Sequence, residues 1–168
     1  MKRTRLRRSG FTLIEVMLVV AIIGTLSAMA IPTAQLFAWR SKRTERTVVM
    51  KSIAQSMKDY LSAHDELVNS RLTQSFLASW NPILPVTALP RPFNAGAPGW
   101  NQLVWQPFGS LRYSYYISGS FSASSSFFLI FAVGDVDANN KLSQKVDRYD
   151  LMSGFWQLTS ETESGDGW

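Results

Sequence analysis

Cysteine is absent from this chain of 168 residues. Its absence excludes disulfide bonds, thiolate metal sites and thiol-based catalysis. Histidine occurs once, at position 64, where Asp65 and Glu66 follow it, and no nucleophile motif or phosphate-binding loop accompanies it. A lone histidine with acidic neighbours at a helix end is usually a solvated surface residue. The sequence therefore predicts that the protein is not an enzyme.

Charge is also absent from one long stretch. Residues 16–39 contain no Asp, Glu, Lys or Arg and are mostly apolar. As an α-helix with a rise of about 1.5 Å per residue, this run would be about 36 Å long, which exceeds the roughly 30 Å hydrocarbon core of a bilayer. We therefore expect a helix that can span a membrane.

A short basic leader precedes the apolar run. Its five positive charges account for the whole formal net charge of +5, so acidic and basic residues balance in the rest of the chain. Positive charge at this end should hold the N-terminus in the cytoplasm and send the C-terminal part across the membrane. The high isoelectric point thus reflects topology rather than a nucleic-acid-binding surface. The charged residues are Lys2, Arg3, Arg5, Arg7 and Arg8.

The junction between the leader and the apolar run resembles the prepilin signature of type IV pilins and of type II secretion pseudopilins. Gly10 stands at the cleavage position, Phe11 at the new N-terminus, Glu15 at the fifth mature position and Pro32 at the twenty-second. The resemblance implies that a prepilin peptidase removes residues 1–10 and methylates the amine of Phe11. It also implies a transmembrane and assembly helix at residues 11–39 and a periplasmic or extracellular head at residues 40–168.

Two residues of the expected transmembrane helix at residues 11–39, Glu15 and Pro32, are unfavourable in a membrane-spanning helix. A charged side chain near the middle of a spanning helix costs on the order of 2.5–3.5 kcal/mol on insertion scales, so Glu15 needs a partner or hydration at the headgroup level. The resemblance implies that Glu15 pairs with the Phe11 amine of a neighbouring subunit during assembly. Pro32 deprives the carbonyl of Ala28 of its helical hydrogen bond. This kink is either passive or a point where the helix opens in a fibre, and the sequence leaves both interpretations open.

One long helix is expected over residues 11–63, with an apolar half followed by an amphipathic half. In the second half, apolar side chains recur at steps of three and four residues, which is typical of a helix face buried against a head domain. The residues expected on the outer face are Lys51, Gln55, Lys58 and Asp59. Those expected in the buried stripe are Met50, Ile53, Met57, Tyr60 and Leu61.

The remaining residues predict an antiparallel sheet packed on the amphipathic half of the helix, which gives an α+β fold of type IV pilin type. A second helix is expected at residues 69–80, where Leu72, Phe76 and Trp80 share a face. A proline-rich surface loop is expected at residues 82–99, and Trp100 beside it is the aromatic residue expected to be exposed. Strands are expected at residues 102–106, 111–118, 126–133 and 154–159, with turns at 119–125 and 134–143.

One motif is a candidate calcium loop. Asp135, Asp137 and Asn139 place oxygen-bearing side chains at alternate positions, as in the first part of a calcium-binding loop. The twelfth position is Val146 rather than glutamate, so the match is incomplete. A hairpin turn rich in Asp and Asn is the alternative. We keep Ca²⁺ as the one candidate cofactor.

The function expected from the resemblance is that of a structural subunit, a minor pilin of a type IV pilus that supports adhesion, twitching motility or DNA uptake. A pseudopilin of a type II secretion system is the alternative, and a membrane-anchored binding module that never polymerises is a third. Expected partners are other pilin or pseudopilin subunits, the prepilin peptidase and an inner-membrane assembly platform, with nucleic acid only through DNA uptake. The expected location is the inner membrane before assembly, then a surface pilus or a periplasmic pseudopilus.

Overall fold

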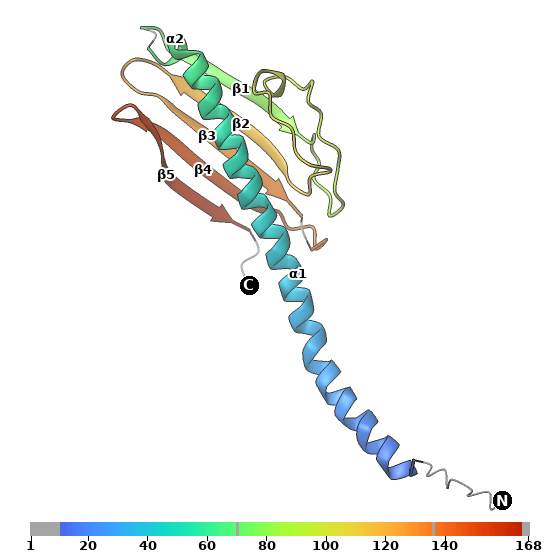
Figure 1. Cartoon of the computed structure of the whole chain (residues 1–168). Coiled ribbons are helices and arrows are strands. Elements are labelled where there is room, and N and C mark those ends of the chain that lie inside the picture. The colour runs from blue at the N-terminus through green and yellow to red at the C-terminus, as the bar shows by residue number, and fades with distance from the viewer. Residues whose placement is uncertain (1–10, 70, 136, 166–168) are drawn as a thin grey trace, which may run out of the picture. The chain divides into compact units, whose positions relative to one another are not determined.

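A long helix followed by a five-stranded antiparallel sheet makes up the molecule, which confirms the expected α+β fold of type IV pilin type (Figure 1). The computed structural model describes residues 11–69, 71–135 and 137–165. The elements in chain order are α1 at Leu13–Ala63, α2 at Asp65–Val68, β1 at Gln74–Asn81, a 3-10 helix at Trp100–Gln102, β2 at Ser114–Phe121, β3 at Phe127–Gly134, β4 at Ser143–Met152 and β5 at Phe155–Ser164.

Helix α1 is continuous over 51 residues and ends at Ala63, as expected. The chain divides after Arg40 into two compact units, so α1 contributes its first part to one unit and its second part to the other. In the unit that begins at Ser41, the second part of α1 lies across one face of the sheet (Figure 1).

The sheet is a meander in which every strand pairs with its neighbour in sequence, in the order β1-β2-β3-β4-β5. Cross-strand pairs such as Tyr116 with Phe131 and Phe128 with Tyr149 fix the register in the middle of the sheet. Register shifts interrupt the pairing in β1 between Ala78 and Asn81 and in β4. Strands β1 and β5 form the two edges of this sheet.

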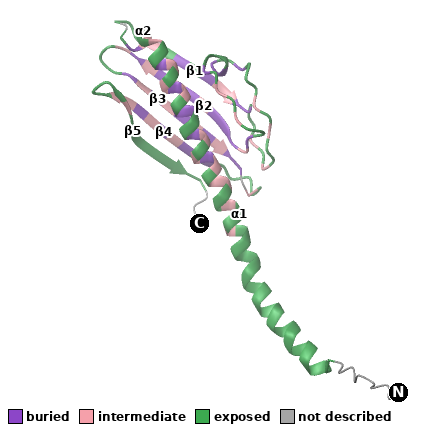
Figure 2. Ribbon diagram, viewed as in Figure 1, coloured by how far each residue is buried: buried purple, intermediate pink, exposed green. Residues whose placement is uncertain are grey.

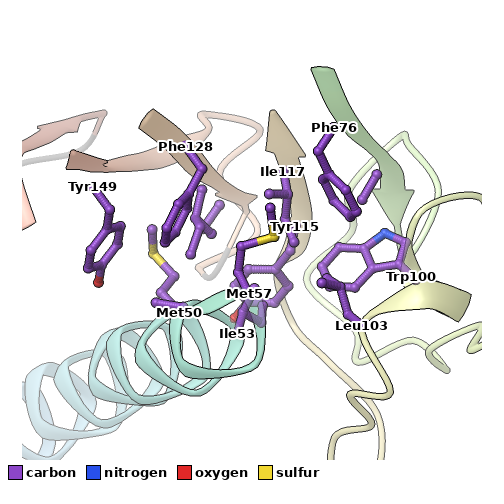
Figure 3. Packing of buried hydrophobic residues seen from close by; sticks show 14 of the residues in the cluster. Met50, Ile53, Met57, Phe76, Trp100, Leu103, Tyr115, Ile117, Phe128 and Tyr149 are labelled. Carbon is purple, nitrogen blue, oxygen red and sulfur yellow. The ribbon is translucent and has the colours of Figure 1, made fainter. Parts of the chain in front are cut away.

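The core lies between the second part of α1 and the sheet, and Figure 3 shows helix side chains reaching toward strand side chains. Met50, Ile53, Met57 and Leu61 are buried on the helix, which confirms the predicted stripe, whereas Tyr60 is only partly buried. Burying a large apolar side chain contributes about 1.5–3 kcal/mol, so this stripe is what holds the helix on the sheet. The strands supply mainly Phe76, Tyr115, Ile117, Phe128, Ile130 and Tyr149.

Three expectations for secondary structure were wrong. Residues 69–80 do not form a helix, because residues 74–81 form β1, in which Phe76 and Ala78 are buried and Leu77 between them is exposed. Residues 102–106 do not form a strand, since Gln102 ends the short 3-10 helix and residues 103–106 form a turn and irregular structure. Strand β4 was not expected at all. The strands expected at residues 111–118, 126–133 and 154–159 correspond to β2, β3 and β5 with shifted ends.

Trp100 is buried, with 1% of its surface exposed, which overturns its expected exposure. Its indole nitrogen donates a hydrogen bond to the carbonyl oxygen of Ser79, and its ring meets Phe93 edge-on at 5.3 Å between centroids. The proline-rich residues 82–99 form neither helix nor strand apart from a single bridge between Arg91 and Leu111, as expected for a loop. Trp100 therefore anchors this loop to the core.

Candidate functional site

Helix α1 begins with a capping box. The backbone N–H and the hydroxyl of Thr12 both donate to Oε2 of Glu15 at 2.8 Å, and the N–H of Glu15 donates to the Thr12 hydroxyl at 3.3 Å. Reciprocal bonds of this kind satisfy amides that the first turn of a helix leaves without partners. Thr12 thus fixes the Glu15 carboxylate beside the start of the helix, a contact that the sequence motif Thr-x-x-Glu could have indicated.

The cleavage position Gly10 lies outside the described residues, whereas Phe11, which would be the new N-terminus, is 85% exposed. Nothing in the structure tests the processing roles expected for Gly10 and Phe11, or the pairing of Phe11 with Glu15 of another subunit. These three roles stay predictions.

The first part of α1 presents its apolar side chains outward. Among residues 11–40, nearly every side chain is exposed, including the leucines, isoleucines and valines of the uncharged run (Figure 2). This is the one helix in the described part of the chain that is long and apolar enough to cross a membrane, with a mean hydropathy of 2.3 in its best window. Such a surface needs either lipid or other protein to cover it.

Pro32 lies inside α1 without ending it. One residue later, the hydroxyl of Thr33 donates to the carbonyl oxygens of Met29 and Ala30 at 3.1 and 2.8 Å. Side-chain bonds of this kind commonly accompany bends in helices, and neither acceptor here is the Ala28 carbonyl that Pro32 deprives of its helical donor. Whether Pro32 bends during assembly stays a prediction.

The loop between β3 and β4 contains the three candidate calcium ligands. Asn139 donates to a carboxylate oxygen of Asp137 at 2.8 Å and accepts from the Lys141 N–H at 2.7 Å, so these side chains already close a turn. Asp135 is 7% exposed, and its Oδ2 accepts from the Asn140 N–H at 3.2 Å. Its Oδ1 is buried without a hydrogen-bond partner among the described residues. One carboxylate oxygen therefore fits a cation, while the other two side chains also serve the turn.

His64 has a structural environment. Its Nδ1 lies 2.9 Å from the carbonyl oxygen of Tyr60, and the two rings stack at 4.3 Å between centroids. It thus occupies the junction where α1 ends and α2 begins.

Within the described ranges, no group of three or more His, Asp or Glu side chains comes close enough to hold a metal ion.

One family model and several curated proteins match part of the chain. The family model described as the prokaryotic N-terminal methylation motif matches residues 5–31. The chain is 48% identical over 59 residues to the type IV major pilin protein PilA of Myxococcus xanthus, which covers 35% of this chain and 27% of that protein. It is 36% identical over 59 residues to a fimbrial protein of Neisseria meningitidis, covering 35% of each chain.

A fimbrial protein of Pseudomonas aeruginosa is 38% identical over 63 residues, which is 38% of this chain and 41% of that protein. The matches thus span less than half the length of these curated relatives. No solved structure matches the chain.

Proposed function

We propose, from the premise that this chain belongs to the type IV pilin and pseudopilin family through its N-terminal methylation motif, that it is a structural filament subunit. It polymerises helix to helix through residues 11–39 and catalyses no reaction. The observation that carries the proposal is the outward-facing apolar surface of the first part of α1.

That apolar surface is covered first by membrane lipid and then by the helices of neighbouring subunits. Before assembly, the hydrocarbon of the inner membrane covers it, because the uncharged run is long enough to span the bilayer. After a subunit leaves the membrane, each large apolar side chain exposed to water would forfeit about 1.5–3 kcal/mol. The same helices of neighbouring subunits provide the replacement cover, so leaving the membrane and polymerising are coupled.

Charge at the start of α1 sets the axial step between subunits. Thr12 holds the Glu15 carboxylate at the helix start through two hydrogen bonds. The positive amine of Phe11 on a neighbouring subunit is the complementary group in the family interpretation. Breaking a buried ion pair by removing one partner costs about 3–5 kcal/mol, so a subunit that enters with this pair unmade is strongly disfavoured.

The basic leader determines where processing takes place and which end of the chain crosses the membrane. Its positive charges keep the N-terminus in the cytoplasm, where a prepilin peptidase cleaves between Gly10 and Phe11 and methylates Phe11. Residues 40–168 then face the periplasm or the outside. The processed subunit meets an inner-membrane assembly platform, which adds it to the growing filament.

A minor pilin of a type IV pilus is the finer form of the proposal, with a role in adhesion, twitching motility or DNA uptake. The content of large aromatics, with six Trp and ten Phe, favours a low-abundance subunit over a main shaft subunit. A pseudopilin in a short periplasmic filament is the second candidate. The lack of cysteine favours it, because many type IV pilins close their C-terminal loop with a disulfide.

Location and abundance of the assembled protein separate these candidates. Cells should be sheared, and surface fibres, periplasm and membranes should be assayed by quantitative mass spectrometry. A minor pilin is expected in the sheared fibres at well below the amount of the main subunit. Recovery only from the periplasm would support the pseudopilin, and recovery only as a membrane monomer would contradict polymerisation in either form.

Calcium at the loop of Asp135, Asp137 and Asn139 is a separate proposal. The buried Oδ1 of Asp135 supports it, because a carboxylate oxygen without a donor is a suitable ligand for a hard cation. A bound ion would fasten the segment between β3 and β4. Ion binding to the folded form alone raises stability by about 2.7 kcal/mol at a hundredfold excess over the dissociation constant.

The test of this proposal is thermal unfolding of the full chain in detergent, with calcium and with chelator. The chain is expected to unfold at a higher temperature with calcium, and Asp135→Ala combined with Asp137→Ala should remove the difference. Asp59→Ala, on the outer face of α1, is the control and should keep it. Superimposable curves with and without calcium in the unsubstituted chain would assign the loop to a plain turn.

A further inference from the structure

Strand β5 is attached to the molecule by few apolar contacts. It is an edge strand that pairs with β4 from Phe155 opposite Met152 to Ser164 opposite Gln144. None of its described side chains is buried, and only Trp156 is partly covered (Figure 2). The backbone amide hydrogens of such an exposed edge strand exchange readily with solvent unless other interactions hold the strand in place.

Two buried cations face β5 from the elements beside it. Arg46 of α1 is 2% exposed, and its Nη1 donates to the Ser143 hydroxyl at 2.9 Å. Lys145 of β4 is 4% exposed and lies 3.8 Å from a carboxylate oxygen of Asp147. Burying a charge costs several kcal/mol unless it is paired, so both cations require anionic partners.

Strand β5 supplies those partners. Nη2 of Arg46 donates to Glu163, and Nζ of Lys145 donates to Glu161, so each cation takes one glutamate from β5. Both glutamate side chains are about half exposed, at 50% and 52%. The two glutamates therefore reach from the edge strand to two buried positive charges.

The geometry points to β5 being a strap held by charge: Glu161 and Glu163 clasp the C-terminal strand of this cysteine-free chain to α1 and β4. When their negative charge is removed, Arg46 loses its carboxylate partner, Lys145 keeps only Asp147, and β5 opens from β4 more often. The β4 edge then becomes unpaired, and such edges template pairing with another chain.

Surrounding groups keep the Glu163 side of the clasp charged at neutral pH. Burial raises the pKa of the Glu163 carboxyl, but the Arg46 hydrogen bond and the charges of Arg46, Arg43 and Lys145 outweigh it and hold the pKa below its ordinary range. For the neighbouring Asp147, burial raises the pKa above its ordinary value, although the charges of Lys145 and Arg46 act to lower it. Acid would thus act on Glu163 and Asp147 in opposite directions, so substitution at constant pH isolates the clasp.

Hydrogen exchange of the full chain in detergent tests the strap at neutral pH. Glu161→Gln combined with Glu163→Gln removes both charges with little change of shape. Backbone amides of β5 are expected to exchange at least about tenfold faster, the equivalent of losing one hydrogen bond to a charged group, while amides of β3 keep their rates. Glu66→Gln, which removes an exposed charge from α2, should leave both strands unchanged.

A charge-keeping variant and a single variant keep the strap testable if the double variant does not fold. Glu163→Asp keeps the charge and should keep β5 protection closer to that of the unsubstituted chain than Glu163→Gln does. If the double variant does not fold, Glu161→Gln alone should accelerate exchange in β5 selectively. Exchange in β5 within twofold of the unsubstituted chain would overturn the strap, and so would equal acceleration of β3 and β5, which indicates general destabilisation.

Discussion

A chain in which Gly10 is replaced by valine is expected to stay uncut in the inner membrane. The small residue at the cleavage position lets the backbone approach the peptidase, and a branched side chain there obstructs it. The variant should retain residues 1–10, lack methylation at Phe11 and be absent from filaments. Intact mass spectrometry of the membrane fraction measures all of this, because precursor and product differ by the whole leader.

Ser9→Ala is the matched control for that experiment, since it changes the neighbouring residue and leaves Gly10 in place. It should be cleaved as the unsubstituted chain is. A normally shortened product from Gly10→Val would remove the basis for assigning residues 1–10 as a prepilin leader.

Glu15→Ala should abolish incorporation into filaments while leaving membrane insertion intact or improved, because an acid is removed from lipid. In the filament the Phe11 amine of a neighbour would be left buried and unpaired. At about 3–5 kcal/mol, that loss corresponds to a drop of two orders of magnitude or more in association. The measurement is the ratio of subunit in sheared or pulled-down fibres to subunit in membranes.

Two further variants separate charge pairing from helix capping. Glu15→Gln keeps an oxygen that accepts from Thr12 but removes the charge, so it should fail as Glu15→Ala does. Thr12→Ala removes the capping hydroxyl and keeps the charge, and a lost cap costs only about 0.5–2 kcal/mol. Fibre recovery from Glu15→Gln equal to that of the unsubstituted chain would mean that the carboxylate acts as a cap alone. Unchanged fibre recovery from Glu15→Ala would contradict an assembly role for the Glu15 carboxylate.

The spacing of apolar residues was sufficient to predict helix α1, but it led to a wrong prediction of a helix where β1 lies. The apolar run and the steps of three and four at Met50, Ile53 and Met57 have no alternative in a strand, so the helix and its buried face could be predicted. Leu72, Phe76 and Trp80 are four residues apart, a spacing that suits one helix face and also falls on alternate positions of a strand. Short apolar segments of this kind are decided by their packing, which here places residues 74–81 at the edge of the sheet.

Strand β4 escaped prediction because its buried side is polar. The positions facing α1 are Ser143, Lys145, Asp147 and Tyr149, so the expected alternation of apolar and polar residues is missing. Lys145 and Asp147 are buried beside each other on β4, and Lys145 also pairs with Glu161 of β5, a contact that the sequence of β4 alone does not reveal. The candidate assembly residues Phe11, Glu15 and Pro32, by contrast, all lie in the N-terminal helix segment and could be proposed from the sequence. Their contacts in a filament involve other subunits, so a single chain does not contain them.

We expect this chain to be cleaved, methylated and built into a filament. The most direct test of this expectation is intact mass spectrometry of the subunit recovered from purified fibres or pseudopili of the cells that produce it. The recovered subunit is expected to begin at Phe11 and to carry one methyl group on its amine. Filaments that never contain the chain, together with a membrane pool that retains residues 1–10, would contradict it.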